Sequence, residues 1–189
     1  MNVARILYPV RVLGPGNRVG IWLCGCSRGC KGCSNPELWV QRPEYEIEPE
    51  KVFMLVNQIN AQHEIDGFTI SGGEPMDQPK ELAKLLEMIR PLSEDVLIYT
   101  GYQFKELEGR KDKWTDFILQ NAAVLIDGAY IESLNGNAVL RGSSNQQIHI
   151  LKSRLCERYA QFFNTAQNQI QNFTTGDGII SVGIHHPTF

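Results

Sequence analysis

The sequence predicts an α/β fold in which a mostly parallel sheet forms a partial (β/α) barrel. Strand-like apolar segments alternate with segments of helical periodicity between residues 19 and 126. Such alternation builds parallel sheets with right-handed crossovers. A complete eight-fold barrel typically needs about 250 residues, whereas this chain has 189. We therefore expect an incomplete barrel.

The individual elements have recognisable start and stop signals. Val52, Val56 and Ile59 recur at helical spacing after Pro49, and Pro91 ends the next helix. The expected strands are residues 19–23, 67–71, 96–99, 124–126, 148–151 and 178–183, and the expected helices lie around residues 52–59, 82–89 and 114–118.

Four short motifs directly follow predicted strands. In parallel α/β sheets the chemistry gathers at the carboxyl ends of the strands, so we expect these motifs to meet on one rim. They are the cysteine loop, Gly72-Gly73-Glu74, Thr100-Gly101 and Asp127-Gly128.

Composition and charge exclude several function classes. A content of 42% hydrophobic and 21% charged residues is typical of a globular domain. The net charge of −3 and the lack of a basic run argue against a nucleic-acid partner. The apolar stretches are far shorter than the roughly 20 residues of a membrane helix, and the N-terminus lacks a signal-peptide core. We expect a cytoplasmic protein with no membrane partner.

The cysteines are clustered rather than spread along the chain. Four of the five lie between Cys24 and Cys33, and a reducing cytosol would keep them as thiols, so they are better suited to a metal than to disulfides. Cys156 stands apart, and we expect it to be a small buried hydrophobe.

The spacing Cys26-x3-Cys30-x2-Cys33 predicts an iron–sulfur cluster. Glycines between the cysteines allow the unusual backbone angles that bring several sulfurs to one inorganic core. Such clusters normally take four cysteines, so three ligands leave one iron open to a substrate. Structural zinc with Cys24 as the fourth ligand is the alternative, although zinc ribbons usually place their cysteine pairs far apart.

A cysteine loop of this spacing followed by Gly-Gly-Glu after the next strand resembles the radical S-adenosylmethionine enzymes. Within that superfamily the chain most resembles the activating enzymes of anaerobic ribonucleotide reductases. The resemblance covers residues 13–152 and rests on the order of several motifs: Gly14-Pro15-Gly16 with Arg18, the cysteine loop with Asn35-Pro36, Ser71-Gly72-Gly73-Glu74-Pro75, Tyr99-Thr100-Gly101-Tyr102, Asp127-Gly128 and Arg141-Gly142-Ser143-Ser144-Asn145-Gln146.

The resemblance implies that the open iron of a [4Fe–4S] cluster is chelated by the methionine moiety of S-adenosylmethionine. Gly72 and Gly73 would let the backbone approach that moiety, and Glu74 would accept hydrogen bonds from its ammonium group. A surface turn that caps a helix is the alternative for this motif. Thr100, which directly follows a strand, is a further candidate contact.

Four more residues are candidate cofactor contacts by resemblance. Arg141 would pair with the carboxylate, while Ser143 and Asn145 would bind ribose, carboxylate or a partner's backbone. Asp127 would lie near the ribose. Asp127, Ser143 and Asn145 also have a structural alternative, because polar residues commonly form turns and start loops. Arg18 would contact the cluster loop or be solvated.

By the same resemblance, one electron from a flavodoxin-like or ferredoxin-like donor reaches the cluster, and S-adenosylmethionine is cleaved to methionine and a 5′-deoxyadenosyl radical. The radical would abstract hydrogen from a glycine of an anaerobic ribonucleotide reductase, or from another protein or peptide. A non-catalytic iron–sulfur or zinc docking module is the alternative from another class.

The resembling family usually ends soon after the segment that matches residues 147–152. We therefore assign residues 1–152 to a radical S-adenosylmethionine core domain, and residues 153–189 to a C-terminal extension packed on it. Residues 153–172 are polar with helical character, and residues 178–183 are strand-like. The final strand either covers the adenine, with His185 or His186 near the site, or forms an edge strand with a polar tail.

Overall fold

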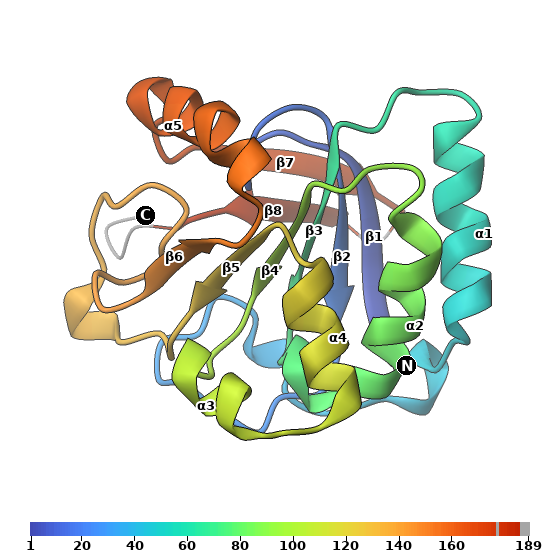
Figure 1. The fold of residues 1–189 in the computed structure, drawn as a ribbon, viewed down its shortest axis with the longest axis horizontal. Helices are drawn as coiled ribbons and strands as arrows, with labels where there is room; N and C mark the ends of the chain where they lie inside the picture. Colours follow the sequence, from blue (N-terminus) through green and yellow to red (C-terminus); the bar gives the residue numbers. More distant parts are fainter. Residues whose placement is uncertain (177, 186–189) are drawn as a thin grey trace.

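A six-stranded sheet forms the centre of the molecule, with helices on one face and a β-hairpin and another helix on the opposite face (Figure 1). The structure, a computed structural model, describes residues 1–176 and 178–185. The strands are β1 (Val3–Val10), β2 (Arg18–Leu23), β3 (Gly67–Gly72), β4 (Val96–Tyr99), β5 (Val124–Asp127), β6 (Gln147–Ile150), β7 (Ile170–Thr175) and β8 (Gly178–Gly183). The helices are α1 (Pro49–Asn60), α2 (Pro79–Ile89), α3 (Phe104–Gly109), α4 (Lys113–Asn121) and α5 (Cys156–Thr165).

The sheet has the order β1-β2-β3-β4-β5-β6. Strands β2 to β5 are parallel, and β1 and β6 pair antiparallel at the two edges. The predicted α/β class and the largely parallel sheet are therefore confirmed, while β1 and β6 remain separate edges in the described chain. The carboxyl ends of β2 to β5 lie at one edge of the sheet, where the predicted motifs begin.

The parallel strands are mainly apolar because both of their faces are buried. Ile21, Ile70 and Ile98 belong to the core shared with α1, α2 and α4. Leu97 and Ile126 point the other way and pack with residues of α5. Burial of each such side chain contributes roughly 1.5–3 kcal/mol, so the two-layered core holds the strand ends in fixed positions.

The strands and helices expected between residues 19 and 126 are confirmed, with α1, α2 and α4 at the predicted places. Three elements were missed. β1 is a half-buried edge strand that contains Pro9, α3 has only six residues, and β7 is rich in polar residues. The expected helical character of residues 153–172 holds only for α5, because Ile170 already begins a strand that alternates between exposed and half-buried residues.

Helix α4 begins with a side-chain cap that the sequence supplies. The carboxylate of Asp112 accepts hydrogen bonds from the backbone N–H groups of Trp114 (3.1 Å) and Thr115 (3.0 Å). We expect Asp112→Ala to lower the free energy of unfolding by about 1 kcal/mol, measured by urea denaturation. Asp112→Asn should keep most of the stability because asparagine also caps helices. Equal losses in both variants would contradict this role.

Arg18 lies neither at the cluster loop nor in solvent. It begins β2, at the end of the sheet opposite the cysteine loop, and its side chain is fully buried. The guanidinium forms an ion pair with Asp95 (3.1 Å) and donates to the hydroxyl of Thr69 (2.7 Å). Tyr159 of α5 donates its hydroxyl to the same Asp95 carboxylate (2.7 Å). This buried network ties α5 to the sheet.

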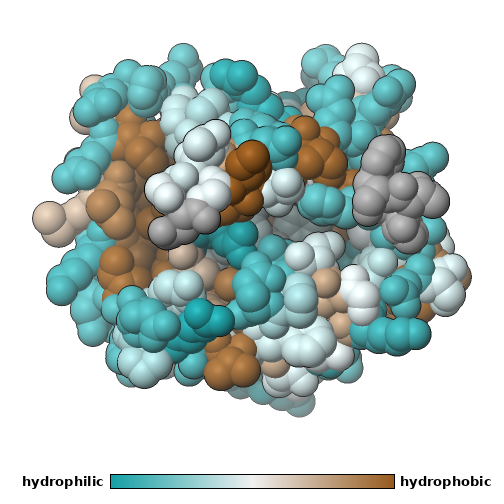
Figure 2. All heavy atoms as spheres, turned by 180° about the vertical axis from the view of Figure 1, so that it is seen from behind, coloured by the Kyte–Doolittle hydropathy of each residue, from teal (hydrophilic) through white to brown (hydrophobic). Residues whose placement is uncertain are grey.

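The hairpin β7–β8 forms a separate two-stranded sheet that packs on the central one. Val182 is buried with Leu13 and Trp22. The Gln171 amide donates to the Pro9 carbonyl (2.6 Å) and accepts from the backbone N–H of Arg11 (2.9 Å). Seen from the hairpin side, the surface is mainly polar, with apolar residues gathered in a band toward one edge (Figure 2).

Cys156 was expected to be buried, but it is exposed at the start of α5. The apolar residues of α5 that meet the sheet are instead Tyr159, Phe162 and Phe163. Among the helices of residues 1–176 and 178–185, none has the length and apolar character needed to cross a bilayer.

Candidate functional site

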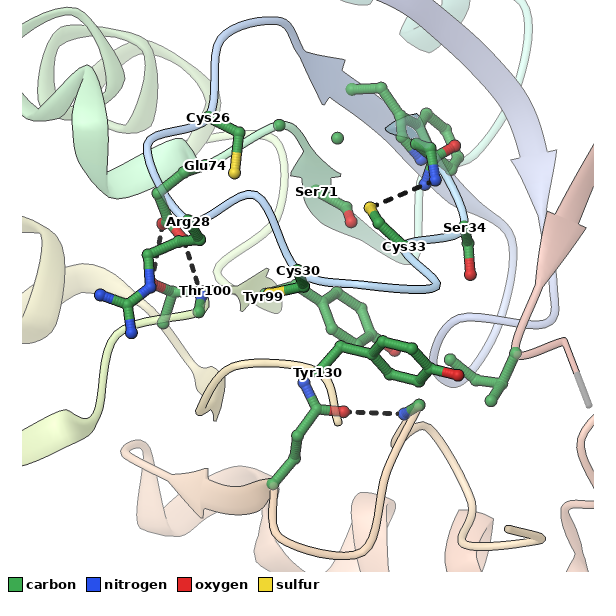
Figure 3. Close-up of a pocket in the computed structure, with 18 of the residues that line it drawn as sticks. Cys26, Arg28, Cys30, Cys33, Ser34, Ser71, Glu74, Tyr99, Thr100 and Tyr130 are labelled. Atoms are coloured by element: carbon green, nitrogen blue, oxygen red, sulfur yellow. Dashed lines mark hydrogen bonds between the residues drawn. The ribbon is translucent and has the colours of Figure 1, made fainter. Parts of the chain in front are cut away.

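A cavity at the carboxyl ends of the parallel strands brings together most of the predicted site (Figure 3). The cysteine loop after β2 forms one wall, and the segments that follow β3 and β4 form another. The predicted residues that line this cavity are Cys26, Cys30, Cys33, Gly72, Gly73, Glu74 and Thr100.

The cysteine loop has the backbone conformation that the glycines predicted. Gly25, Gly29 and Gly32 have positive φ angles of 104°, 55° and 73°, which other residues rarely adopt. The three cysteines that each follow one of these glycines are half-buried and carry free thiols. Burial raises the pKa of the Cys26 thiol.

Cys24 is packed away from this cavity. It is fully buried beside Trp22 and Leu38, and its thiol donates to the Val40 carbonyl (2.9 Å). Within residues 1–176 and 178–185, no group of three His, Cys, Asp or Glu side chains is close enough to hold a single metal ion. Cys24 therefore does not join the other three cysteines at the cavity, and sulfurs spread around a cavity suit a cluster with several irons.

Tyr102 connects the cysteine loop to the segment that follows β3. The guanidinium groups of Arg28 and Arg110 both lie over its ring, at 4.6 and 4.0 Å from the ring centroid. Its hydroxyl donates to Asp77 (2.7 Å), which also accepts from the backbone N–H of Ser27 (2.8 Å). These contacts hold the first half of the loop against the segment after β3.

Gly72 and Gly73 are required by the close packing of two backbones. A Cβ atom on Gly72 would lie 2.2 Å from the Leu23 carbonyl oxygen, and one on Gly73 would lie 2.2 Å from that of Gly25. Gly73 donates its N–H to Leu23 (2.8 Å), and Glu74 donates to Gly25 (2.7 Å). The glycines thus join the segment after β3 directly to the start of the cysteine loop.

Glu74 is buried, and three donors surround its carboxylate. Oε1 accepts from the hydroxyl of Thr100 (2.7 Å) and the N–H of Met76 (2.9 Å), while Oε2 accepts from the N–H of Gly101 (2.6 Å). Burial raises the pKa of Glu74 to about 7 against the effect of these hydrogen bonds. A carboxylate has about four acceptor positions, so one remains available to a ligand.

Four predicted contacts lie outside the cavity wall, and each has at least one polar side-chain atom that is bonded within the fold. The Asp127 carboxylate accepts from the N–H of Phe104 (2.7 Å) and lies 3.1 Å from His149 Nε2. Arg141 donates to the Gln146 carbonyl (3.2 Å).

The same holds for the polar turn after Arg141. Ser143 accepts from the N–H of Ile131 (3.1 Å), and Asn145 donates to the Ala129 carbonyl (2.8 Å). Gln146 does reach the cavity, and its amide bridges Gly128 and Gly142. These contacts agree with the structural alternatives given for Asp127, Ser143 and Asn145, while the cofactor contacts of all four residues stay predictions.

Several lining residues were missed or left undecided. Trp39, Tyr130 and four consecutive residues of the C-terminal hairpin and its end, 181–184, line the cavity together with Tyr99. Isolated aromatic residues have no spacing signature, so only their position near the rim motifs could have identified Trp39 and Tyr130. His185 is not a lining residue, and His186 lies outside the described residues.

Two buried polar atoms of the cavity wall lack a partner. The Trp39 indole N–H and the Tyr99 hydroxyl form no hydrogen bond in the described structure. An unpaired buried polar group costs about 1–3 kcal/mol. Three thiols and an available carboxylate position fit a cluster with an open iron and a polar cofactor beside it.

Comparison with known proteins gives the same family. Residues 12–149 match the model of the 4Fe-4S single cluster domain. Proteins named anaerobic ribonucleoside-triphosphate reductase-activating protein align over 153 residues. Those of Haemophilus influenzae and Escherichia coli K12 are 32% and 29% identical, and each alignment covers 77% of this chain and 96% of the relative. The relative from Enterobacteria phage T4 is 31% identical, and the alignment covers 78% of this chain and 93% of the relative. The chain belongs to the 4Fe-4S single cluster domain family, together with the activating proteins of anaerobic ribonucleoside-triphosphate reductases.

Proposed function

We propose that the protein cleaves S-adenosylmethionine reductively at a [4Fe–4S] cluster and uses the 5′-deoxyadenosyl radical to abstract hydrogen from a glycine of an anaerobic ribonucleotide reductase. The observation that carries this proposal is the single cavity lined by Cys26, Cys30, Cys33 and Glu74. The names of the relatives support the choice of reductase.

The chain's own residues have distinct tasks in this proposal. Cys26, Cys30 and Cys33 bind the cluster and leave one iron for the methionine moiety. Glu74 would accept a hydrogen bond from the amino group at its remaining acceptor position, and Thr100 and Gly101 keep the carboxylate oriented. The cofactor supplies the radical chemistry, while the protein fixes its position and limits access of water.

The wider setting of the reaction is part of the same proposal. The open sheet corresponds to a partial barrel of the radical S-adenosylmethionine type, and its unclosed side admits a segment of the protein substrate. A flavodoxin-like or ferredoxin-like protein supplies the electron in the cytoplasm. A different protein or peptide substrate remains the second candidate, because α5 and the hairpin lie beyond the family match.

The direct test uses anaerobically reconstituted protein with dithionite and S-adenosylmethionine. We expect 5′-deoxyadenosine to form, detected by chromatography, and the reductase to acquire a glycyl radical signal in electron paramagnetic resonance. Cleavage without that signal would favour the second substrate class. A fully loaded cluster that gives no cleavage, with or without the reductase, would identify a docking module.

Glu74 makes cofactor binding depend on pH. With a pKa of about 7, the ionised fraction rises about tenfold between pH 6 and pH 8. Because the N–H groups of the methionine moiety need the ionised carboxylate as their acceptor, the affinity for S-adenosylmethionine should rise about tenfold over this range. Equilibrium binding without reductant measures it.

The matched controls are two carboxylate-to-amide changes. Glu74→Gln should bind more weakly and lose the pH dependence, whereas Glu87→Gln, on the exposed side of α2, should behave as the unmodified protein. An affinity that is constant from pH 6 to pH 8 in the unmodified protein would refute the assigned role.

A further inference from the structure

The C-terminal hairpin contributes directly to the cavity that holds the cysteines. Residues 181–184, at the end of β8, line this cavity beside the segments that follow β4 and β5. The match to the family model ends at residue 149, so this wall is an addition to the shared core. A ligand bound in this cavity would therefore contact the hairpin.

The backbone edge of β8, rather than one face of the strand, lines the cavity. Side chains of a strand alternate between its two faces, yet Ser181, Val182 and Gly183 line the cavity in succession. The Val182 side chain is 4% exposed and packs on the central sheet. One edge of β8 is paired with β7, and the described chain places no strand on the other edge.

The hairpin register indicates which backbone groups point to this free edge. Two residues connect Thr175 to Gly178, and in such hairpins the flanking residues form a hydrogen-bonded pair. Hydrogen-bonded and non-hydrogen-bonded pairs then alternate, so Ser181, opposite Asn172, is a non-hydrogen-bonded position. Its N–H and C=O groups therefore point away from β7, as do those of Ile179.

Side-chain hydrogen bonds connect the segments before β7 and after β8 to the loop between β5 and β6. The Asn168 side chain donates to the Ala138 carbonyl (3.1 Å) and accepts from the Leu140 N–H (3.3 Å), which fixes the segment entering β7. At the other end, the Asn135 amide donates to both the His185 carbonyl (3.0 Å) and the Tyr130 hydroxyl (3.0 Å). β-strand addition by a peptide uses an exposed sheet edge, whereas this edge lines a cavity, so a small planar ligand fits better.

Adenine matches these groups. Its exocyclic amino group donates and the adjacent ring nitrogen accepts, which complements one outward C=O and one outward N–H of a strand residue. Tyr130 and Tyr99 supply aromatic surface in the same cavity, on which a base can pack. Gly128 and Gly142 leave room because they carry no side chains.

We propose that the free edge of β8, centred on Ser181, binds the adenine base of S-adenosylmethionine. The inference rests on the proposed function. It makes the C-terminal hairpin part of the cofactor site, with the methionine moiety at Glu74 and the base at β8.

The test replaces one outward N–H without removing a bond between β7 and β8. Proline is tolerated in a strand where its nitrogen faces away from the partner strand, so Ser181→Pro should fold. Ile179→Pro is the matched control, because Ile179 is also an outward position but is 69% exposed and lies outside the cavity. Ser181→Ala separates the hydroxyl from the backbone N–H.

Binding is measured at equilibrium on the reconstituted protein without reductant, with S-adenosylmethionine and with free methionine as ligands. We expect Ser181→Pro to lower the affinity for S-adenosylmethionine about tenfold, which is the effect of one lost hydrogen bond to a buried ligand. Methionine affinity should stay unchanged, and Ile179→Pro and Ser181→Ala should bind both ligands normally. Iron content and the thermal unfolding midpoint verify that each variant is folded.

The outcomes separate this inference from the proposed function. If the loaded, unmodified protein binds no S-adenosylmethionine, the proposed function itself is wrong. The adenine site is wrong, while the function stands, if the unmodified protein binds S-adenosylmethionine and Ser181→Pro has the same affinities as Ile179→Pro. The same conclusion follows if Ser181→Pro lowers the affinities for S-adenosylmethionine and for methionine equally. Weakened binding of the reductase with unchanged S-adenosylmethionine affinity would assign the edge to the protein substrate and overturn the proposal.

Discussion

Replacement of Cys30 by alanine should prevent assembly of the [4Fe–4S] cluster and reduce 5′-deoxyadenosine formation to the background of the protein-free assay. Cys30 lies in the middle of the loop and lines the cavity together with Cys26 and Cys33. Two remaining cysteines would leave two irons without protein ligands, and such a cluster is open to solvent and loss. Iron and sulfide content and visible absorbance after anaerobic reconstitution measure the effect.

Two other cysteines provide matched controls. Cys156→Ala removes an exposed thiol on α5 and should leave both cluster content and cleavage unchanged. Cys24→Ala removes a buried thiol that donates to Val40, so it should lower stability while the cluster still assembles. Cluster loss in Cys24→Ala with retention in Cys30→Ala would overturn the assignment of ligands and revive a site that includes Cys24.

The sequence predicted those parts of the site whose geometry depends on the backbone conformation. The glycines of the cysteine loop predicted its left-handed conformations, and the apolar strands before Gly72 and Thr100 predicted that these motifs meet on one rim. Both inferences depend on local residue type and on strand polarity. Neither needs knowledge of which side chains face each other across the fold.

Side-chain assignments that depend on distant partners were less predictable. Asp127 follows β5 as expected, but its carboxylate turns toward the N–H of Phe104 at the start of α3, a short helix that the sequence did not reveal. Arg18 was expected at the cluster loop or in solvent, but the register places it at the opposite end of β2, beside Asp95. In both cases the partner comes from a separate element.

The hairpin illustrates the same limit. The strand at residues 178–183 was predicted, but its pairing was not, because β7 alternates polar residues that are also common in loops. Only the assembled structure shows that β8 leaves an edge at the cavity instead of joining the central sheet. The extension therefore matters to the site through its backbone, which carries no sequence motif.

The largest expected effect on stability comes from Asp95. Its carboxylate is 3% exposed and pairs with the fully buried Arg18 guanidinium at 3.1 Å. Removal of one partner from a buried ion pair leaves an uncompensated charge and costs about 3–5 kcal/mol. We therefore expect Asp95→Ala to lower the free energy of unfolding by that amount, measured by urea denaturation of the apoprotein.

Two further variants identify the cause of this loss. Tyr159→Phe removes only the hydroxyl that donates to Asp95 (2.7 Å), so it should cost less, about 1.5–3 kcal/mol for a hydrogen bond to a charged group. Arg18→Leu combined with Asp95→Leu removes both charges and should recover part of the stability of Asp95→Ala, because apolar pairs often replace buried ion pairs without loss. If the double variant is less stable than Asp95→Ala, the uncompensated charge is not the main cause of the loss, and the hydrogen bonds from Arg18 to Thr69 and to the Phe68 carbonyl must hold this end of the sheet.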